Sequence, residues 1–233
     1  MKIAFSWDDG APEDQKLFNL HEKYEIPGMF FVPNRNREGR AVLSPQQIKN
    51  SESKYVSFGG HTYNHTYLTD IPIEDVEKEV LENKYYLEDI LGHEIPDFCL
   101  PGGKYNNQIV EIIYRHFKTI RTADTMNFLY REGILKPSIH FYPRGNKSLI
   151  GNAKRGNSYS ELLYLLPRLN KTYFELVNGL IKLESKKNSS IVVIWGHSWE
   201  IEEYGLWGEL ENLFNYLVNQ YSEYIVSYDK IFE

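Results

Sequence analysis

The chain has 233 residues, of which 42% are hydrophobic and 15% aromatic. This length can bury one substantial core and falls within the usual range of an α/β barrel, so we expect a single domain over residues 1–233. The formal net charge of -6 offers no basic surface for nucleic acid or an anionic membrane, and neither is an expected partner. The composition leaves the oligomeric state open.

The first residues bear on where the protein acts. Met1-Lys2-Ile3 runs directly toward Asp8, which leaves no room in the numbered chain for a secretion signal. The longest aliphatic and aromatic run, 191–195, is far shorter than a membrane span. The single cysteine, Cys99, cannot form an internal disulfide and is interpreted as a small buried residue. A cytoplasmic location is therefore expected.

Strand-like and helical patterns alternate along the chain, which implies a parallel sheet with right-handed crossovers. Short apolar runs predict about eight strands, and 146–157 is expected to be a mobile loop. Apolar residues at helical spacing predict the helices. The strands are expected over 2–7, 28–32, 55–60, near 98, and over 118–122, 139–142, 191–195 and 224–227, and the helices over 12–25, from 44, over 73–91, over 158–187 with a break at Pro167, and over 204–221.

Two clusters of polar residues follow predicted strands. Asp8 and Asp9 end the first strand, and His61 and His65 come just after 55–60. The carboxyl ends of parallel strands face one rim, where active sites are built. Carboxylate and imidazole ligands suit zinc or a related metal, and one aspartate can bind the metal while its neighbour acts as a base. Alone, each motif could be a turn, a helix pair or two core histidines; their joint placement favours a catalytic metal site.

The residues also resemble a known family. Ser6-Trp7-Asp8-Asp9-Gly10 is similar to the Thr-Phe-Asp-Asp-Gly motif of the polysaccharide deacetylases of carbohydrate esterase family 4, and 61–65 matches their His-Ser/Thr-x-x-His motif. Pro101-Gly102-Gly103 and Trp195-Gly196-His197 resemble two later motifs. The resemblance implies a distorted (β/α) barrel of seven to eight parallel strands, similar to a TIM barrel.

The resemblance also implies a role for each matching residue. Asp8 would be the catalytic base, and His197 would be the acid that protonates the leaving amine. The backbone N–H of Gly102 would stabilise an oxyanion. One divalent metal ion, expected to be zinc, would be bound by Asp9, His61 and His65, while Thr62 would orient a histidine or cap the loop.

One position departs from the family pattern. The third motif usually begins with an arginine that orients the base, and Cys99 stands there. A thiol cannot replace the charge-assisted hydrogen bonds of a guanidinium. Arg121, at the end of the next predicted strand, is the candidate substitute and is grouped with the substrate-binding residues; Arg144 is second. Both could equally be solvated surface residues.

Several aromatic and titratable residues lie beside these motifs. Trp7, Trp195 and Trp199 are expected to line the substrate site, because an aromatic wall can hold an acetyl methyl or a sugar ring. Glu200 could tune His197 or be a solvated carboxylate. His140 could reach the rim or be a core histidine. His21, His93 and His116 are interpreted as surface or helix-end residues.

The favoured function is a metal-dependent hydrolase that removes N-linked acetyl groups from an amino-sugar glycan, oligosaccharide or sugar conjugate. Two alternatives stay open on the same scaffold: a hydrolase of a small amide, ureide or O-acetyl ester, and a catalytically silent carbohydrate-binding protein. The sequence does not identify the metal or the glycan linkage.

Overall fold

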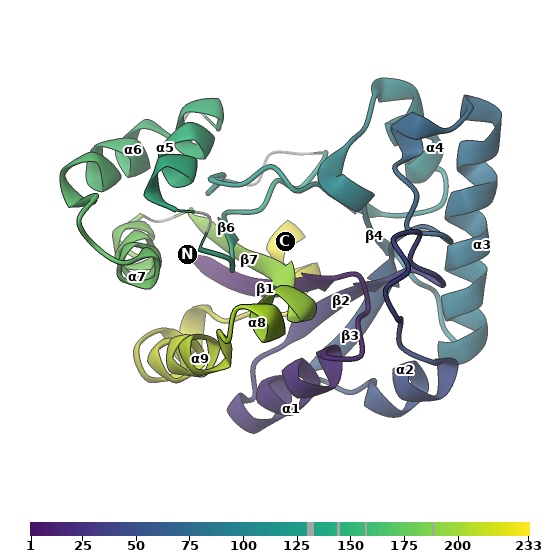
Figure 1. Cartoon of the computed structure of the whole chain (residues 1–233), viewed down its shortest axis with the longest axis horizontal. Coiled ribbons are helices and arrows are strands. Elements are labelled where there is room, and N and C mark those ends of the chain that lie inside the picture. Colours follow the sequence, from purple (N-terminus) through teal and green to yellow (C-terminus); the bar gives the residue numbers. More distant parts are fainter. Residues whose placement is uncertain (130–132, 144, 157, 188) are drawn as a thin grey trace.

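The computed structural model describes residues 1–129, 133–143, 145–156, 158–187 and 189–233. Within these residues seven strands form one sheet in the order β5-β4-β3-β2-β1-β7-β6, and all neighbours are parallel. The sheet curls into a half-barrel (Figure 1), which confirms the predicted α/β barrel-like fold. The strands are β1 (Lys2–Asp8), β2 (Gly28–Val32), β3 (Val56–Gly60), β4 (Asp97–Cys99), β5 (Thr119–Arg121), β6 (Ile139–His140) and β7 (Ile191–His197).

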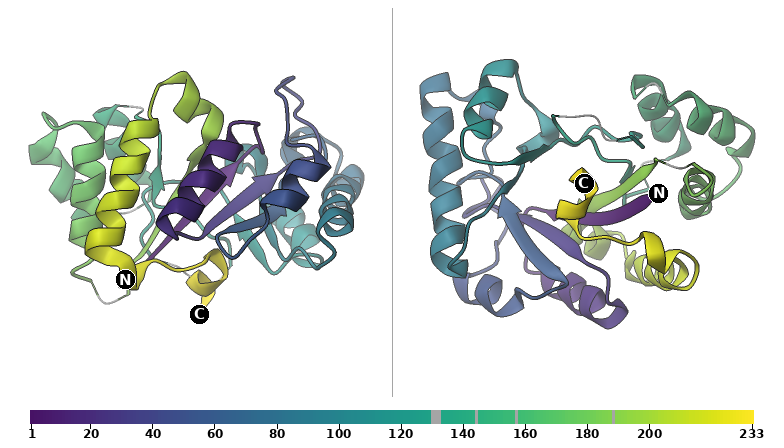
Figure 2. Two further views of the ribbon diagram at one scale, coloured as in Figure 1. Left: turned by 90° about the horizontal axis from the view of Figure 1, so that it is seen from below. Right: turned by 180° about the vertical axis from the view of Figure 1, so that it is seen from behind.

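Helices surround the outer side of the curled sheet (Figure 2). Their ends follow local signals: Ser44 caps α2 through a capping box, Gly92 ends α3 in a left-handed conformation, and Pro167 falls in the expected break between α6 and α7. The helices are α1 (Asp14–Tyr24), α2 (Pro45–Ser51), α3 (Ile73–Leu91), α4 (Asn107–Tyr114), α5 (Asn146–Arg155), α6 (Tyr159–Leu165), α7 (Tyr173–Glu184), α8 (Ser198–Glu203) and α9 (Trp207–Tyr221).

Two of the predicted elements are wrong. The residues expected as a mobile loop over 146–157 form α5 through Arg155. The expected eighth strand over 224–227 makes only an isolated bridge, Ile3 to Ile225, because the chain then turns into the 3-10 helix η5 (Tyr228–Phe232). That helix packs its Tyr228 and Ile231 into the interior of the half-barrel. The packing of η5 into the interior therefore overrides the apolar pattern that predicts a strand over 224–227.

Alternation along β1 separates the two faces of the sheet. Ala4 belongs to the small interior cluster with Val193 and Tyr228, whereas Phe5 and Trp7 belong to the large cluster under the helices. Since successive side chains of a strand point to opposite faces, Asp8 lies on the interior side with Ala4. The interior face therefore carries polar groups at the carboxyl end of the strands.

The two edge strands, β5 and β6, are joined by a segment that partly bridges the opening of the half-barrel. Leu135 makes a parallel bridge to Arg121 of β5, and Ser138 donates its backbone N–H to Val193 of β7. Helices α5, α6 and α7 follow this segment and stand beside the open side of the sheet (Figure 1). In the described part of the chain, no helix combines the length and the apolar character needed to cross a membrane.

His21, expected at the surface or a helix end, is fully buried in the last turn of α1. The indole N–H of Trp7 donates to its Nε2 at 2.7 Å, and its Nδ1 lies 2.7 Å from the Ile26 carbonyl oxygen. The ring is therefore neutral, with its proton on Nδ1. Burial lowers the pKa of His21 to about 4, although the hydrogen bond to Ile26 opposes the shift.

Because the folded-state pKa of His21 lies below the unfolded value of 6.5, its contribution to stability is present above pH 6.5 and is lost as the pH falls toward 4. We expect the metal-free protein to lose about 2 kcal/mol of unfolding free energy through this group between pH 7 and pH 5. Urea unfolding of wild type and His21→Gln at both pH values measures the difference. His93→Gln is the control: hydrogen bonds that His93 donates to the Glu94 carbonyl and the Glu52 carboxylate raise its pKa, so removal of His93 should increase the acid loss. An equal acid loss in wild type and His21→Gln would contradict the prediction.

Candidate active site

The site begins where β1 and β3 end. Beyond β1, Asp9 adopts a left-handed backbone conformation with φ 77°, and beyond β3, Thr62 and His65 do so with φ 64° and 56°. Such φ values are uncommon for residues with a side chain and concentrate at functional sites. Thr62 holds its loop by accepting the backbone N–H of Thr66 at 3.0 Å, in agreement with the expected capping role.

Asp9, His61 and His65 come together as the sequence predicts. One potential ligand atom from each lies within 4.8 Å of the others, and all three residues are buried. Oδ1 of Asp9 is 3.5 Å from Nε2 of His61 and 3.0 Å from Nε2 of His65. A carboxylate and two imidazoles within this distance are a donor set that could hold a divalent metal ion.

The surroundings of His61 fix its orientation. Its Nδ1 lies 2.8 Å from the carbonyl oxygen of Cys99, which directs the Nε2 lone pair toward Asp9. Its backbone N–H donates to Oδ1 of Asn83 at 2.7 Å, and Asn83 in turn donates to Val32 and Asn34. Carbonyl acceptors behind a metal-binding histidine commonly hold its tautomer. Asn83, on α3, is a supporting residue that sequence reasoning missed.

Asp9 has partners on its second oxygen as well. Trp199 donates its indole N–H to Oδ2 at 2.9 Å, and Nε2 of His197 lies 3.9 Å from the same atom. Burial by itself would raise the pKa of Asp9, but the charge of His197 and the close contacts of His61 and His65 hold it well below its usual value. The carboxylate is therefore ionised and available to a cation.

Asp8 is held by Arg121. A guanidinium nitrogen of Arg121 forms a buried ion pair with Oδ1 of Asp8, and the thiol of Cys99 lies 3.6 Å from Oδ2. Burial raises the pKa of the Cys99 thiol well above its usual value, so it is neutral and can donate. The position of Arg121 beside Asp8 agrees with the predicted substitution for the missing arginine. Arg144, the second candidate, lies outside the described residues.

The carboxylate of Glu200 holds two histidines on the other side of the site. Oε2 of Glu200 lies 2.7 Å from Nδ1 of His197 and 2.9 Å from Nε2 of His140. Burial alone would lower the pKa of His197, but Asp9 and Glu200 together raise it to about 9. Although burial opposes the change, His140 and His197 lower the pKa of Glu200 to about 2. His197 is therefore a cation whose Nε2 faces Asp9.

One cavity of about 1480 Å³ contains these groups. Asp8, Asp9 and His197 line it together with Gly102, Trp195 and Trp199. Gly102 has φ 62°, and a Cβ there would lie 2.9 Å from the ring of Tyr67, so the position requires glycine. Trp195 stacks on His140 with ring centroids 4.1 Å apart. The structure thus brings most of the predicted site residues to one cavity.

Two of the predicted substrate contacts are wrong. Trp7 is fully buried on the outer face of β1, because Asp8 occupies the interior face and neighbouring strand residues alternate. Arg121 is also fully buried, between the rings of Phe31 and Trp195, and contacts Asp8 rather than the open cavity. The pairing of His140 with Glu200 was not predicted, because their elements are distant in the sequence.

Known proteins resemble this chain in sequence and in fold. The family model described as polysaccharide deacetylase matches residues 1–116. The peptidoglycan-N-acetylglucosamine deacetylase of Bacillus cereus is 23% identical over 192 residues, which cover 75% of this chain and 84% of that protein. A family 4 carbohydrate esterase from Streptomyces lividans, solved with acetate, aligns with a TM-score of 0.57 and 11% identity over 94% of this chain and 88% of that chain.

Other matches are partial. A Streptococcus pyogenes deacetylase solved with acetate is 24% identical, with a TM-score of 0.49, over 52% of this chain and 56% of its own. The alignment therefore spans little more than half the length of that relative. The Streptomyces lividans structure supports the barrel-like fold over nearly the whole chain. Together with the Bacillus cereus relative, the match of the family model to residues 1–116 shows that the chain belongs to the polysaccharide deacetylase family.

Proposed function

We propose that the protein is a metal-dependent hydrolase that removes N-linked acetyl groups from an amino-sugar glycan, oligosaccharide or sugar conjugate. The observation that carries the proposal is the arrangement in one cavity of the Asp9, His61 and His65 cluster, an arginine-held Asp8, and His197 facing the cluster. Membership in the polysaccharide deacetylase family supports it.

The residues present fit a divalent metal ion, and zinc is the proposed one. His61 is oriented through the Cys99 carbonyl so that its Nε2 faces Asp9, while Asp9 itself is ionised. Asp9, His61 and His65 would hold the ion and leave a coordination position open. When bound, such an ion polarises an amide carbonyl and acidifies a water molecule.

Asp8 would accept the proton of the attacking water. Its Oδ1 is engaged by Arg121, which leaves Oδ2 as the basic atom toward the cavity, beside the weak Cys99 donor. Arg121 fixes the orientation of the carboxylate through a charge-assisted bond. The neutral Cys99 thiol adds no charge to this side.

His197 would supply the proton that the departing amine requires. An amide nitrogen leaves poorly as an anion, so a positioned acid is chemically necessary. Glu200 holds Nδ1 of His197, which directs Nε2 and its proton toward Asp9 and the cavity. The backbone N–H of Gly102 would stabilise the tetrahedral oxyanion, and Trp195 and Trp199 would form the walls around the acetyl group and sugar.

The alternatives predict different products. Metal-reconstituted protein should release acetate from N-acetyl chitooligosaccharides; turnover only of small amides or O-acetyl sugars would favour the second reading. Sugar binding without any turnover would favour a silent binding protein. The retained Asp8, His197 and ligand cluster favour the deacetylase over the silent protein.

His61→Ala should abolish both metal binding and acetate release, because two remaining ligands hold a divalent ion weakly. Metal content after dialysis, measured by atomic emission, checks the first effect and an acetate assay the second. His93→Ala, an exposed histidine far from the cluster in sequence, is the matched control and should keep full metal content. Stoichiometric zinc in His61→Ala would refute the ligand assignment.

Asp8→Asn should keep the metal and lose turnover, because an amide cannot accept the proton of water. Positioned proton-transfer groups contribute roughly 10²- to 10⁴-fold, which sets the expected loss in kcat. Metal content and kcat measured on the same preparation separate the two roles. A variant that keeps wild-type kcat would show that Asp8 is not the base.

Arg121→Lys should lower kcat and keep metal content, because an ammonium retains the charge but not the planar geometry of the guanidinium. Separate measurement of kcat and KM is diagnostic: a less well-held Asp8 should lower kcat and leave KM unchanged, whereas a general structural defect would also weaken substrate binding. An unchanged kcat would exclude a positioning role.

A further inference from the structure

We infer that the cavity contains a second binding subsite, formed by the segment between β5 and β6 together with α5, for an anionic group on the substrate. Thr125, Asn127, Asn152 and Arg155 form this subsite, and the anion would be a carboxylate or a phosphate next to the acetylated sugar. The inference deepens the proposed function and rests on it for the position of the acetyl group.

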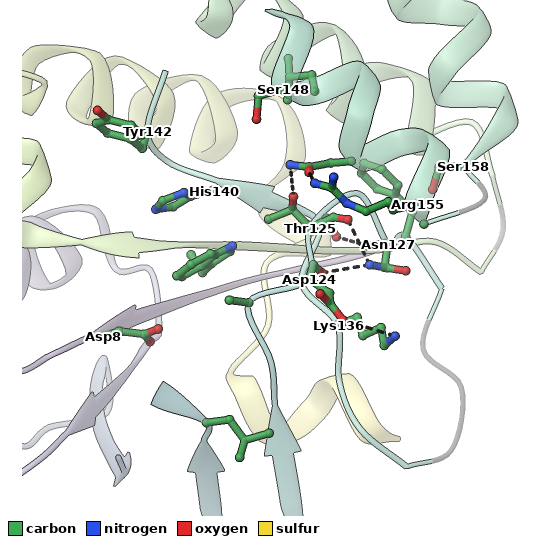
Figure 3. A pocket seen from close by; sticks show the side chains of 18 of the residues that line it. Asp8, Asp124, Thr125, Asn127, Lys136, His140, Tyr142, Ser148, Arg155 and Ser158 are labelled. Carbon is green, nitrogen blue, oxygen red and sulfur yellow. Dashed lines mark hydrogen bonds and ion pairs between the residues drawn. The ribbon is translucent and has the colours of Figure 1, made fainter. Parts of the chain in front are cut away.

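The cavity has room for more than one sugar ring. Its volume of about 1480 Å³ exceeds the ~300 to ~1,000 Å³ typical of sites for compact ligands. In Figure 3, Thr125, Asn127 and Arg155 gather on one side of the cavity, and Asp8 lies on another. The cavity thus continues from the catalytic groups to a separate polar wall.

Hydrogen bonds between its two elements hold this wall together. Asn152 of α5 donates to Oγ1 of Thr125 at 2.7 Å, and the hydroxyl of Ser158 donates to the carbonyl oxygen of Met126. The backbone of Gly156 also lies close to this segment, since a Cβ on Gly156 would be 2.8 Å from the same Met126 oxygen. A wall held in this way can present side chains to a ligand without large rearrangement.

The charges along the wall favour an anion at Arg155. Lys136 lies 3.4 Å from a carboxylate oxygen of Asp124, and Lys187 bonds Glu161 and Glu184, so both lysines are neutralised locally. The hydrogen-bond partner of Arg155 is instead the amide oxygen of Asn152, which leaves its charge uncompensated by that contact. A guanidinium beside uncharged groups suits bidentate binding of a carboxylate or phosphate.

These residues belong to the second half of the chain. The family model matches residues 1–116, whereas the wall is formed by residues between 125 and 158. The wall therefore lies outside the residues that the family model matches. It would select among acetylated sugars by the group that they carry next to the acetamide.

Equilibrium binding tests the subsite separately from turnover. Three probes would be titrated by calorimetry into metal-free full-length protein: di-N-acetylchitobiose, the same disaccharide with a 6-phosphate, and the same disaccharide with a lactyl ether carboxylate. We expect at least one anionic probe to bind roughly 10- to 100-fold tighter than the neutral one, as for hydrogen bonds to a charged group. The two anionic probes distinguish phosphate from carboxylate recognition.

Arg155→Gln should remove this preference and leave binding of the neutral probe unchanged. Lys154→Gln removes a charge from the neighbouring position of the same helix, which does not line the cavity, and should retain the preference. Equal affinities of wild type for all three probes, or a preference that persists in Arg155→Gln, would overturn the inference.

Acetate release by the zinc-loaded protein separates this inference from the proposed function. Release from the neutral probe without any preference for an anionic one would overturn the subsite and leave the deacetylase intact. Tighter, Arg155-dependent binding of an anionic probe without acetate release would support the subsite and contradict the deacetylase. Failure to bind any probe would overturn the subsite, and the acetate assay would then test only the proposed deacetylase activity.

Discussion

The buried ion pair between Arg121 and Asp8 is the contact on which the site depends. The two residues end β5 and β1, which lie four positions apart in the sheet order. In a flat sheet the strands would be ~19 Å apart, far beyond the reach of any ion pair. The contact therefore exists only because the sheet curls, and it crosses the interior of the half-barrel. Removing one partner of such a pair typically costs about 3 to 5 kcal/mol, because the other charge is left buried and unpaired.

The groups around this pair divide into two halves with opposite tasks. On the Asp9 side, His61 and His65 are held by loop conformations and by the Cys99 carbonyl, so their lone pairs converge on one point. On the other side, Glu200 holds His197 and makes it a cation. Basic and acidic groups thus face each other across the cavity. Hydrolysis of an amide needs both in the same step, one to accept a proton and one to donate it.

Cys99 shows how the chain accommodates a change in the family pattern. Its side chain occupies the interior position of β4, and its small size leaves room for the Arg121 guanidinium to reach Asp8 from β5. The same residue uses its backbone carbonyl to orient His61. One position therefore serves both the metal cluster and the base. A larger side chain at 99 would compete with Arg121 for the same interior space.

Sequence alone determined the strand–helix alternation, the strand ends that carry Asp8, Asp9 and His61, and the candidacy of Arg121, because short-range patterns and motif order encode all of these. The alternation of side chains along a strand also predicts the outward position of Trp7, which must face away from the interior if Asp8 faces into it. Tertiary structure alone decided the burial of His21, the Asn83 support behind His61, and the His140 and Glu200 pair. It also formed α5 of the cavity wall from residues 146–155 of the expected loop, and it placed η5 after the isolated bridge where an eighth strand was expected. These features depend on contacts between segments far apart in the chain, and no local pattern specifies which distant side chain will fill a given space or accept a given hydrogen bond.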